Sequence, residues 1–151
     1  MLSIIKSNPS SFDQNIDGYF KSIGEILDHI YVSDIHWIND FRTVRKFSIH
    51  EDQIFNSLPE YGKRHSTSID GLIEKRSDVD DLVIKMCSEI KSEDLEMNVV
   101  KVRRNGQRVE KVFWKAIIHF FNHQTHHRGQ IAEMLDILQI ENDYSNMVFI
   151  E

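Results

Sequence analysis

The chain has 151 residues, a formal charge of −6 and 40% hydrophobic residues, with 6 Gly and 2 Pro. A chain of this length fits a single domain, residues 1–151, and its composition is that of a globular, helix-rich protein. The negative charge argues against nucleic acid as a partner, because binding to the phosphate backbone needs Lys and Arg.

The chain contains one cysteine, Cys87, which cannot form an internal disulfide and therefore fits a reducing compartment. No run of about 18 apolar residues occurs, and no basic N-terminal segment precedes a long apolar one. We expect a soluble, cytoplasmic protein with no membrane partner. Cys87 falls on an apolar helical stripe, which favours core packing over a reactive thiol.

The first half of the chain predicts one long helix and a connection. Residues 1–16 lack periodicity, and we expect a loop there. From about Asp17 to Val44, apolar residues recur at steps of three and four, which predicts a core-facing helix. Residues 45–67 contain Pro59, the second of the two prolines, and Gly62. This segment predicts a connection with a short helix around Ile49 to Leu58.

The second half predicts two more long helices with a hairpin between them. One helix runs from Ser66 or Ser68, each a plausible N-cap, to Lys91. Between Leu95 and Phe113 the hydrophobic period changes to two around Asn105-Gly106, the strongest two-residue hairpin signal. The last helix runs from about Val112 to Gln139. The tail from Glu141 is expected to be a loop or extended, with four apolar residues able to dock on the helices: Met147, Val148, Phe149 and Ile150.

The last predicted helix contains four of the eight histidines, all in the nine-residue stretch 119–127. On a helix, His119, His123 and His127 form one column, and His126 lies beside it. Two imidazoles one turn apart can bind the same metal ion. Gly129 lies inside this helix, where glycine lowers helix stability by about 1 kcal/mol relative to alanine. A glycine at this position indicates close packing against another element.

The spacing of His123 and His127 equals that of the H-E-x-x-H helix of zinc proteases. Gln124 stands where those enzymes have their glutamate, and an amide has no useful basicity near neutral pH. The pattern therefore predicts a metal-binding helix that does not belong to a zinc protease.

A tetrahedral site needs a further ligand from another element. His29 is the best candidate on helical geometry, and His36, His50 and His65 are weaker ones. An isolated histidine at the border of an apolar stripe can equally be a hydrogen-bonded boundary residue. Three neutral imidazoles suit zinc, nickel or iron(II), and the sequence does not choose among these divalent metals.

Two segments together resemble the DinB-like (damage-inducible) family of metal-dependent four-helix bundles. They are YFKSIGEILDHI, from Tyr19 to Ile30, and NHQTHHRGQ, from Asn122 to Gln130. The resemblance extends over about Phe12 to Leu138. It implies an all-α, up-down-down-up four-helix bundle with a small β-hairpin before the last helix.

The resemblance also implies a histidine triad on one divalent metal, formed by His29, His123 and His127. His119 would lie one turn away from this site. Three further residues would support the site or the bundle by hydrogen bonds: His126, Arg128 and Gln130. No catalytic residue is identified.

The chain departs from the family at its N-terminus, where the usual first long helix is shortened or missing. A bundle without that helix would expose an apolar groove. We expect either a true start further upstream or a homodimer that fills the groove. Asp28 replaces the Asn that commonly precedes the ligand histidine, a change that should not prevent metal binding.

Characterised relatives in the family include thiol S-transferases. The resemblance therefore implies a metal-dependent transferase that joins a low-molecular-weight thiol to an electrophile, or a hydrolase. The alternative is a non-catalytic metal-binding or stress-response protein without turnover, because fold similarity does not transfer function. A di-iron carboxylate bundle fits poorly, since paired Glu-x-x-His motifs are absent.

Overall fold

The computed structural model describes residues 1–103, 105–142 and 144. Within these residues it contains four α-helices and one two-stranded hairpin, which confirms the all-α class and the hairpin before the last helix. The elements are α1 (Leu2–Ser7), α2 (Ile23–Phe41), α3 (Ile69–Glu89), β1 (Asn98–Val102), β2 (Arg108–Val112) and α4 (Phe113–Ile137), with the short 3-10 helices η1 (Pro9–Ser11), η2 (Ser48–Glu51), η3 (Gln53–Asn56) and η4 (Ser92–Glu96).

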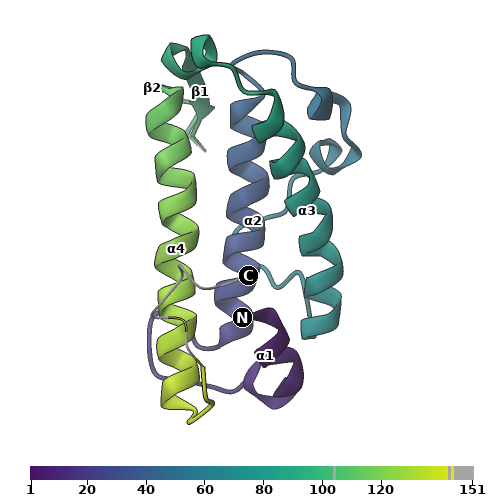
Figure 1. Ribbon diagram of the computed structural model, residues 1–151, viewed down its shortest axis with the longest axis vertical. Helices are drawn as coiled ribbons and strands as arrows, with labels where there is room; N and C mark the ends of the chain where they lie inside the picture. Colours follow the sequence, from purple (N-terminus) through teal and green to yellow (C-terminus); the bar gives the residue numbers. More distant parts are fainter. Residues whose placement is uncertain (104, 143, 145–151) are drawn as a thin grey trace.

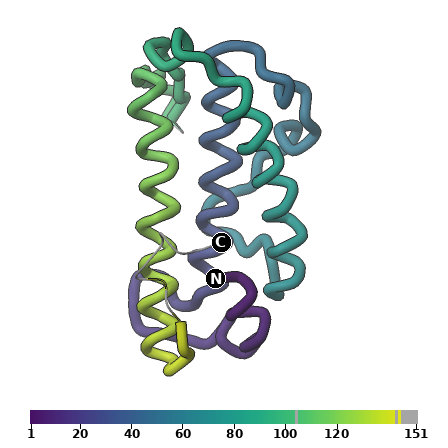
Figure 2. Tube along the Cα trace, in the orientation of Figure 1, coloured from purple at the N-terminus to yellow at the C-terminus, as the bar shows by residue number. Residues whose placement is uncertain are grey.

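The three long helices lie side by side, with α2 between α3 and α4 (Figure 1). The chain trace shows that α2 and α3 run in the same direction and that α4 runs in the opposite one (Figure 2). Residues 42–68 link the end of α2 to the start of α3. This connection runs back along the length of the bundle, which allows the two helices to be parallel. This order is the one that an up-down-down-up bundle requires of its last three helices.

Serine caps set where two of these helices begin. The Ser22 Oγ accepts a hydrogen bond from the Glu25 backbone N–H at 3.2 Å, so α2 begins later than the predicted Asp17. The Ser68 Oγ accepts one from the Gly71 N–H at 3.2 Å, as expected for the N-cap of α3. The late start of α2 leaves residues 17–22 free to form a loop.

The hairpin forms where the Asn-Gly signal predicted it, but its loop is longer than a two-residue turn, since the Arg103 N–H donates to the Gln107 carbonyl oxygen at 2.9 Å. The two strands are antiparallel, with Asn98 opposite Val112 and Val102 opposite Arg108. Gly106 has a φ of 80°, the left-handed conformation that glycine adopts without strain. The hairpin leads directly into α4, since Phe113 follows β2.

Two apolar clusters fill the bundle, and a polar layer separates them. One cluster centres on Phe41, Phe113 and Phe120, and the other on Ile26 and Ile131. Between the clusters, each long helix contributes polar side chains to the interior. They are His29 and Asp34 of α2, Arg76 of α3, and His123, Gln124 and His127 of α4.

The N-terminal segment is shorter than a bundle helix and covers one end of the molecule (Figure 1). Helix α1 has six residues, among them Ile5, which is fully buried. Ile84 of α3 and Phe121 of α4 remain 65% and 43% exposed. The N-terminal helix is present and short, as the sequence analysis expected, whereas the homodimer stays a prediction.

Several finer predictions were wrong or fall outside the described residues. Residues 1–16 contain helical turns, and the short helix expected around Ile49 to Leu58 is replaced by two 3-10 helices. Cys87 is exposed and does not pack in the core. The docking predicted for residues 147–150 lies outside the described residues. None of the helices in the described part of the chain combines the length and the apolar character that a membrane span needs.

Candidate metal centre

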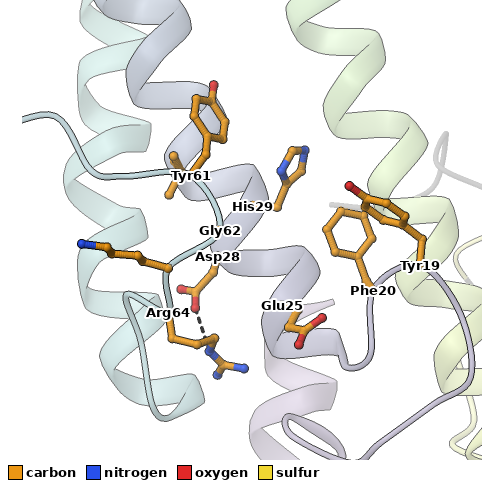
Figure 3. A pocket seen from close by; sticks show the side chains of 10 residues that line it. Tyr19, Phe20, Glu25, Asp28, His29, Tyr61, Gly62 and Arg64 are labelled. Atoms are coloured by element: carbon orange, nitrogen blue, oxygen red, sulfur yellow. Dashed lines mark ion pairs between the residues drawn. The ribbon is translucent and has the colours of Figure 1, made fainter. Parts of the chain in front are cut away.

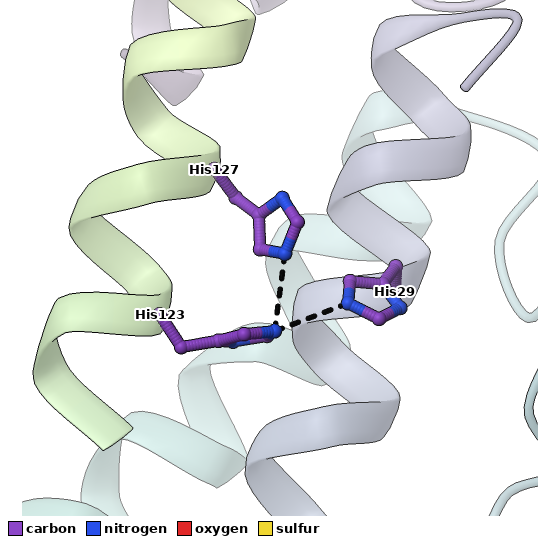
Figure 4. Close-up of side chains that lie close together, drawn as sticks. All are labelled: His29, His123 and His127. Carbon is purple, nitrogen blue, oxygen red and sulfur yellow. Dashed lines mark hydrogen bonds between the residues drawn. The ribbon is translucent and has the colours of Figure 1, made fainter. Parts of the chain in front are cut away.

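Two helices position the three histidines at the middle of the bundle. His29 lies on α2, one turn after Glu25, and its ring points toward α4 (Figure 4). His123 and His127 lie one turn apart on α4, so both rings point toward α2. His127 is buried at 6% exposure, and the other two are half-buried.

The three Nε2 atoms converge on one point. His123 Nε2 lies 3.1 Å from His29 Nε2 and 3.0 Å from His127 Nε2. All three candidate ligand atoms are within 4.8 Å of one another. A tetrahedral zinc ion with Zn–N bonds of about 2.05 Å would hold its nitrogen ligands about 3.3 Å apart. The two separations that involve His123 are within about 0.3 Å of this value.

Hydrogen bonding explains why these nitrogens suit a cation. The Gln130 Oε1 accepts a hydrogen bond from His127 Nδ1 at 2.7 Å, which leaves a lone pair on Nε2 of neutral His127. If His123 Nε2 carries a proton, that N–H can donate a well-aligned hydrogen bond to His29 Nε2 or to His127 Nε2, but not to both. Hydrogen bonds therefore leave at least one of these nitrogen atoms without a partner. Within the described chain, the buried His123 Nδ1 also lacks a partner. A divalent ion at the centre would accept all three Nε2 lone pairs.

Burial keeps the imidazoles neutral, the form that binds metal. Desolvation is the main cause and the neighbouring His127 and His29 add to it, and together they lower the pKa of His123 to about 4. Desolvation also lowers the pKa of His29, and His127 adds to this effect. The pKa of His127 is lowered by burial in spite of the hydrogen bond to Gln130.

The other histidines lie outside this cluster. His36 Nε2 donates a 2.9 Å hydrogen bond to the Pro59 carbonyl oxygen, and His65 Nε2 donates one of the same length to the Glu60 carbonyl oxygen. His50 belongs to η2, beyond the end of α2. The structure therefore brings together the residues of the predicted triad and separates them from the weaker candidates. Their role as metal ligands stays a prediction.

The remaining predicted site residues have different surroundings. The His126 ring packs edge-on against His127 at 5.0 Å between centroids, on the exposed side of α4. Arg128 donates to the Thr125 Oγ1 at 3.3 Å within its own helix. The His119 ring stacks obliquely on Trp37 at 5.1 Å and lies 6.1 Å from His123, one turn from the cluster. Of the three expected supporting residues, Gln130 makes the direct hydrogen bond.

A cavity of about 540 Å³ opens beside His29 (Figure 3). Its walls come from α2, from the loop that precedes α2, and from the connection between α2 and α3. The Phe20 ring packs against His29 and His127, at centroid distances of 5.2 and 5.6 Å. A small molecule in this cavity would lie directly beside the histidine cluster.

The sequence analysis missed a second polar group that crosses the bundle. The fully buried Asp34 of α2 forms an ion pair with Arg76 of α3 and accepts a 2.9 Å hydrogen bond from Gln124 Nε2 of α4. Burial raises the pKa of Asp34, and the contacts with Arg76 and Gln124 oppose this shift. Gln124 therefore ties α4 to α2, which is a structural use of the position that holds a glutamate in zinc proteases. A carboxylate within an otherwise apolar stripe was the signal that could have revealed it.

One of three comparisons with known proteins identifies a family for this chain. No curated protein and no solved structure matches the chain significantly. The model of the DinB family matches residues 6–138, which include all three long helices and the histidine cluster. The chain therefore belongs to the DinB family.

Proposed function

We propose that this chain is a metal-dependent enzyme that transfers a low-molecular-weight thiol to an electrophile. The observation that carries the proposal is the convergence of three neutral imidazole nitrogens beside a cavity of about 540 Å³. His29, His123 and His127 would hold a divalent ion. Structural zinc sites are usually closed and rich in sulfur, whereas three histidines leave a coordination position open for substrate.

The chemistry follows from this open position. A bound divalent ion would lower the pKa of a coordinating thiol and so favour the thiolate, which is the nucleophile. The sulfur would form a bond to an electrophilic carbon, the leaving group would depart with its electron pair, and the thiol proton would pass to solvent. Phe20 packs against His29 and His127 and so would shield one side of the bound ion from solvent. Gln130 fixes the orientation of the His127 ring.

The test is thiol transfer by protein loaded in turn with zinc, nickel or iron(II). Cysteine, cysteamine and glutathione would be offered with 1-chloro-2,4-dinitrobenzene, and the conjugate followed by absorbance. We expect a rate with at least one metal that exceeds the rate of the metal-free protein and that is lost in His29→Ala. His126→Ala, which changes an exposed histidine outside the cluster, is the matched control.

The alternative is metal binding without turnover. If the chain retains one ion yet accelerates transfer of none of the three thiols, the enzymatic proposal is wrong. The chain would then be a metal-binding or stress-response protein.

A further inference from the structure

All but one of the charged side chains that line the cavity beside His29 form ion pairs. The Arg64 Nη1 lies 2.8 Å from Asp13, and its Nε lies 2.9 Å from Asp28. Arg64 also donates to the Ser66 carbonyl oxygen at 2.8 Å. The N–H groups of this guanidinium therefore already donate to two carboxylates and a carbonyl oxygen. Few N–H groups remain to bind an anionic ligand.

The second cation of the cavity wall is also paired. The Lys63 Nζ lies 2.8 Å from the Glu60 carboxylate, and both side chains are largely exposed. The wall therefore offers no free cation among the described residues. An anionic substrate group would meet two carboxylates around Arg64 and find no partner of its own.

Glu25 is the exception, because this half-buried carboxylate has no cation partner within the described chain. Its Oε2 accepts a hydrogen bond from the Lys21 backbone N–H at 2.7 Å, which contributes to the cap of α2. A carboxylate has capacity for several hydrogen bonds, so the group retains acceptor sites toward the cavity. Glu25 and His29 lie one turn apart and both line the cavity (Figure 3).

Three aromatic side chains, Tyr19, Phe20 and Tyr61, line the same cavity as this carboxylate. Phe20 and Tyr61 flank His29 at centroid distances of 5.2 and 6.3 Å. Tyr19 packs edge-on against Phe20 at 5.0 Å and is 92% exposed at the rim. Aromatic faces together with a carboxylate attract a cation and have no comparable attraction for an anion.

We propose that Glu25 and the aromatic wall bind the ammonium group of the thiol substrate, so that the preferred substrate is an aminothiol. This inference rests on the thiol-transfer function proposed above. One helical turn separates Glu25 from His29, about 5.4 Å along the axis. Because both side chains lie on the same face of α2, an aminothiol with a short spacer of two or three carbons could reach both a metal at the histidines and the Glu25 carboxylate.

The test compares three thiols that share a two-carbon spacer and differ in terminal charge. They are cysteamine, 2-mercaptoethanol and 3-mercaptopropionate. Their dissociation constants would be measured on cobalt-loaded protein through the absorption changes that accompany sulfur ligation. The unaltered chain would be compared with Glu25→Gln, which keeps an oxygen acceptor for the Lys21 N–H. Glu74→Gln, at an exposed position of α3, is the control.

We expect Glu25→Gln to weaken cysteamine binding about 10-fold to 100-fold, the effect of losing a charge-assisted hydrogen bond. Binding of 2-mercaptoethanol should change less than about 2-fold on the same basis, since it makes no ionic contact with Glu25. Intrinsic differences among the thiols cancel when the two proteins are compared. Unchanged cobalt content and melting temperature would show that Glu25→Gln has kept the fold and the metal site.

Two results would overturn the inference, and they have different consequences. If Glu25→Gln weakens all three thiols equally, or none of them, thiols bind without recognition of an ammonium group and the transfer function stands. If no thiol ligates the cobalt of the unaltered chain, the transfer proposal itself fails and this inference fails with it.

Discussion

Replacing Arg76 with methionine should destabilise the protein strongly and in a pH-dependent manner. Arg76 is the cation that balances Asp34, and the two side chains are 14% and 0% exposed. Breaking such a buried pair from one side costs about 3–5 kcal/mol, because a charge is left buried without compensation. The second partner of Arg76, Asp80, is 55% exposed, so its loss adds little. Methionine occupies a similar volume and limits the loss of packing.

The pH dependence follows from the remaining carboxyl. Burial already raises the pKa of Asp34, and removal of Arg76 takes away the main group that opposes this shift. A group whose pKa is raised on folding contributes stability below its unfolded pKa, and this contribution is lost as the pH rises through the folded pKa, at about 1.4 kcal/mol per unit. We therefore expect Arg76→Met to lose about 3–5 kcal/mol at pH 8 and clearly less at pH 5.

Urea unfolding of the metal-free protein, followed by circular dichroism at both pH values, measures this difference. Lys85→Met, an exposed substitution on the same helix, controls for the loss of a positive charge. The double variant with Asp34→Asn removes the buried charge and should recover much of the loss at pH 8. A loss below about 1 kcal/mol at pH 8, or an equal loss at both pH values, would refute this reasoning.

Three further predictions concern the core, a helix glycine and the support of the histidine cluster. Phe41→Ala should cost about 3–5 kcal/mol in chemical unfolding, because the ring is fully buried between two other aromatic rings; a loss under 1 kcal/mol would contradict this packing. Gly129→Ala should stabilise the protein by up to about 1 kcal/mol, since a Cβ there meets nothing within 4 Å; a lowered melting temperature would show an unexpected contact. Gln130→Leu should weaken metal affinity about 10-fold to 100-fold in competition titrations by removing the acceptor of His127, and an unchanged affinity would exclude this supporting role.

The sequence predicted most reliably those features that depend on local patterns. Three of these features are the hydrophobic periodicity of α3 and α4, the N-cap at Ser68 and the Asn-Gly turn. Each involves residues that lie near one another in the chain. The family resemblance selected His29 among several histidines, and the structure brings its Nε2 to 3.1 Å from that of His123. Helical geometry alone had left this choice open.

Features that depend on contacts between distant segments were missed. Gly129 was expected to pack closely, yet it faces open space. At Gly24, by contrast, an added Cβ would lie 2.9 Å from a guanidinium nitrogen of Arg64, forty positions later in the chain. The pairing of Asp34 with Arg76 likewise joins two helices whose mutual arrangement no local pattern gives. The cavity depends on loops of residues 17–22 and 59–65, which carry no periodic signal.

The central claim is that His29, His123 and His127 form one metal site. Elemental mass spectrometry of protein purified without an affinity tag, measured beside His123→Ala and His126→Ala, tests it most directly. We predict near one divalent ion per chain, lost in His123→Ala and retained in His126→Ala. No metal in the unaltered chain even after reconstitution, or full occupancy in His123→Ala, would contradict the account.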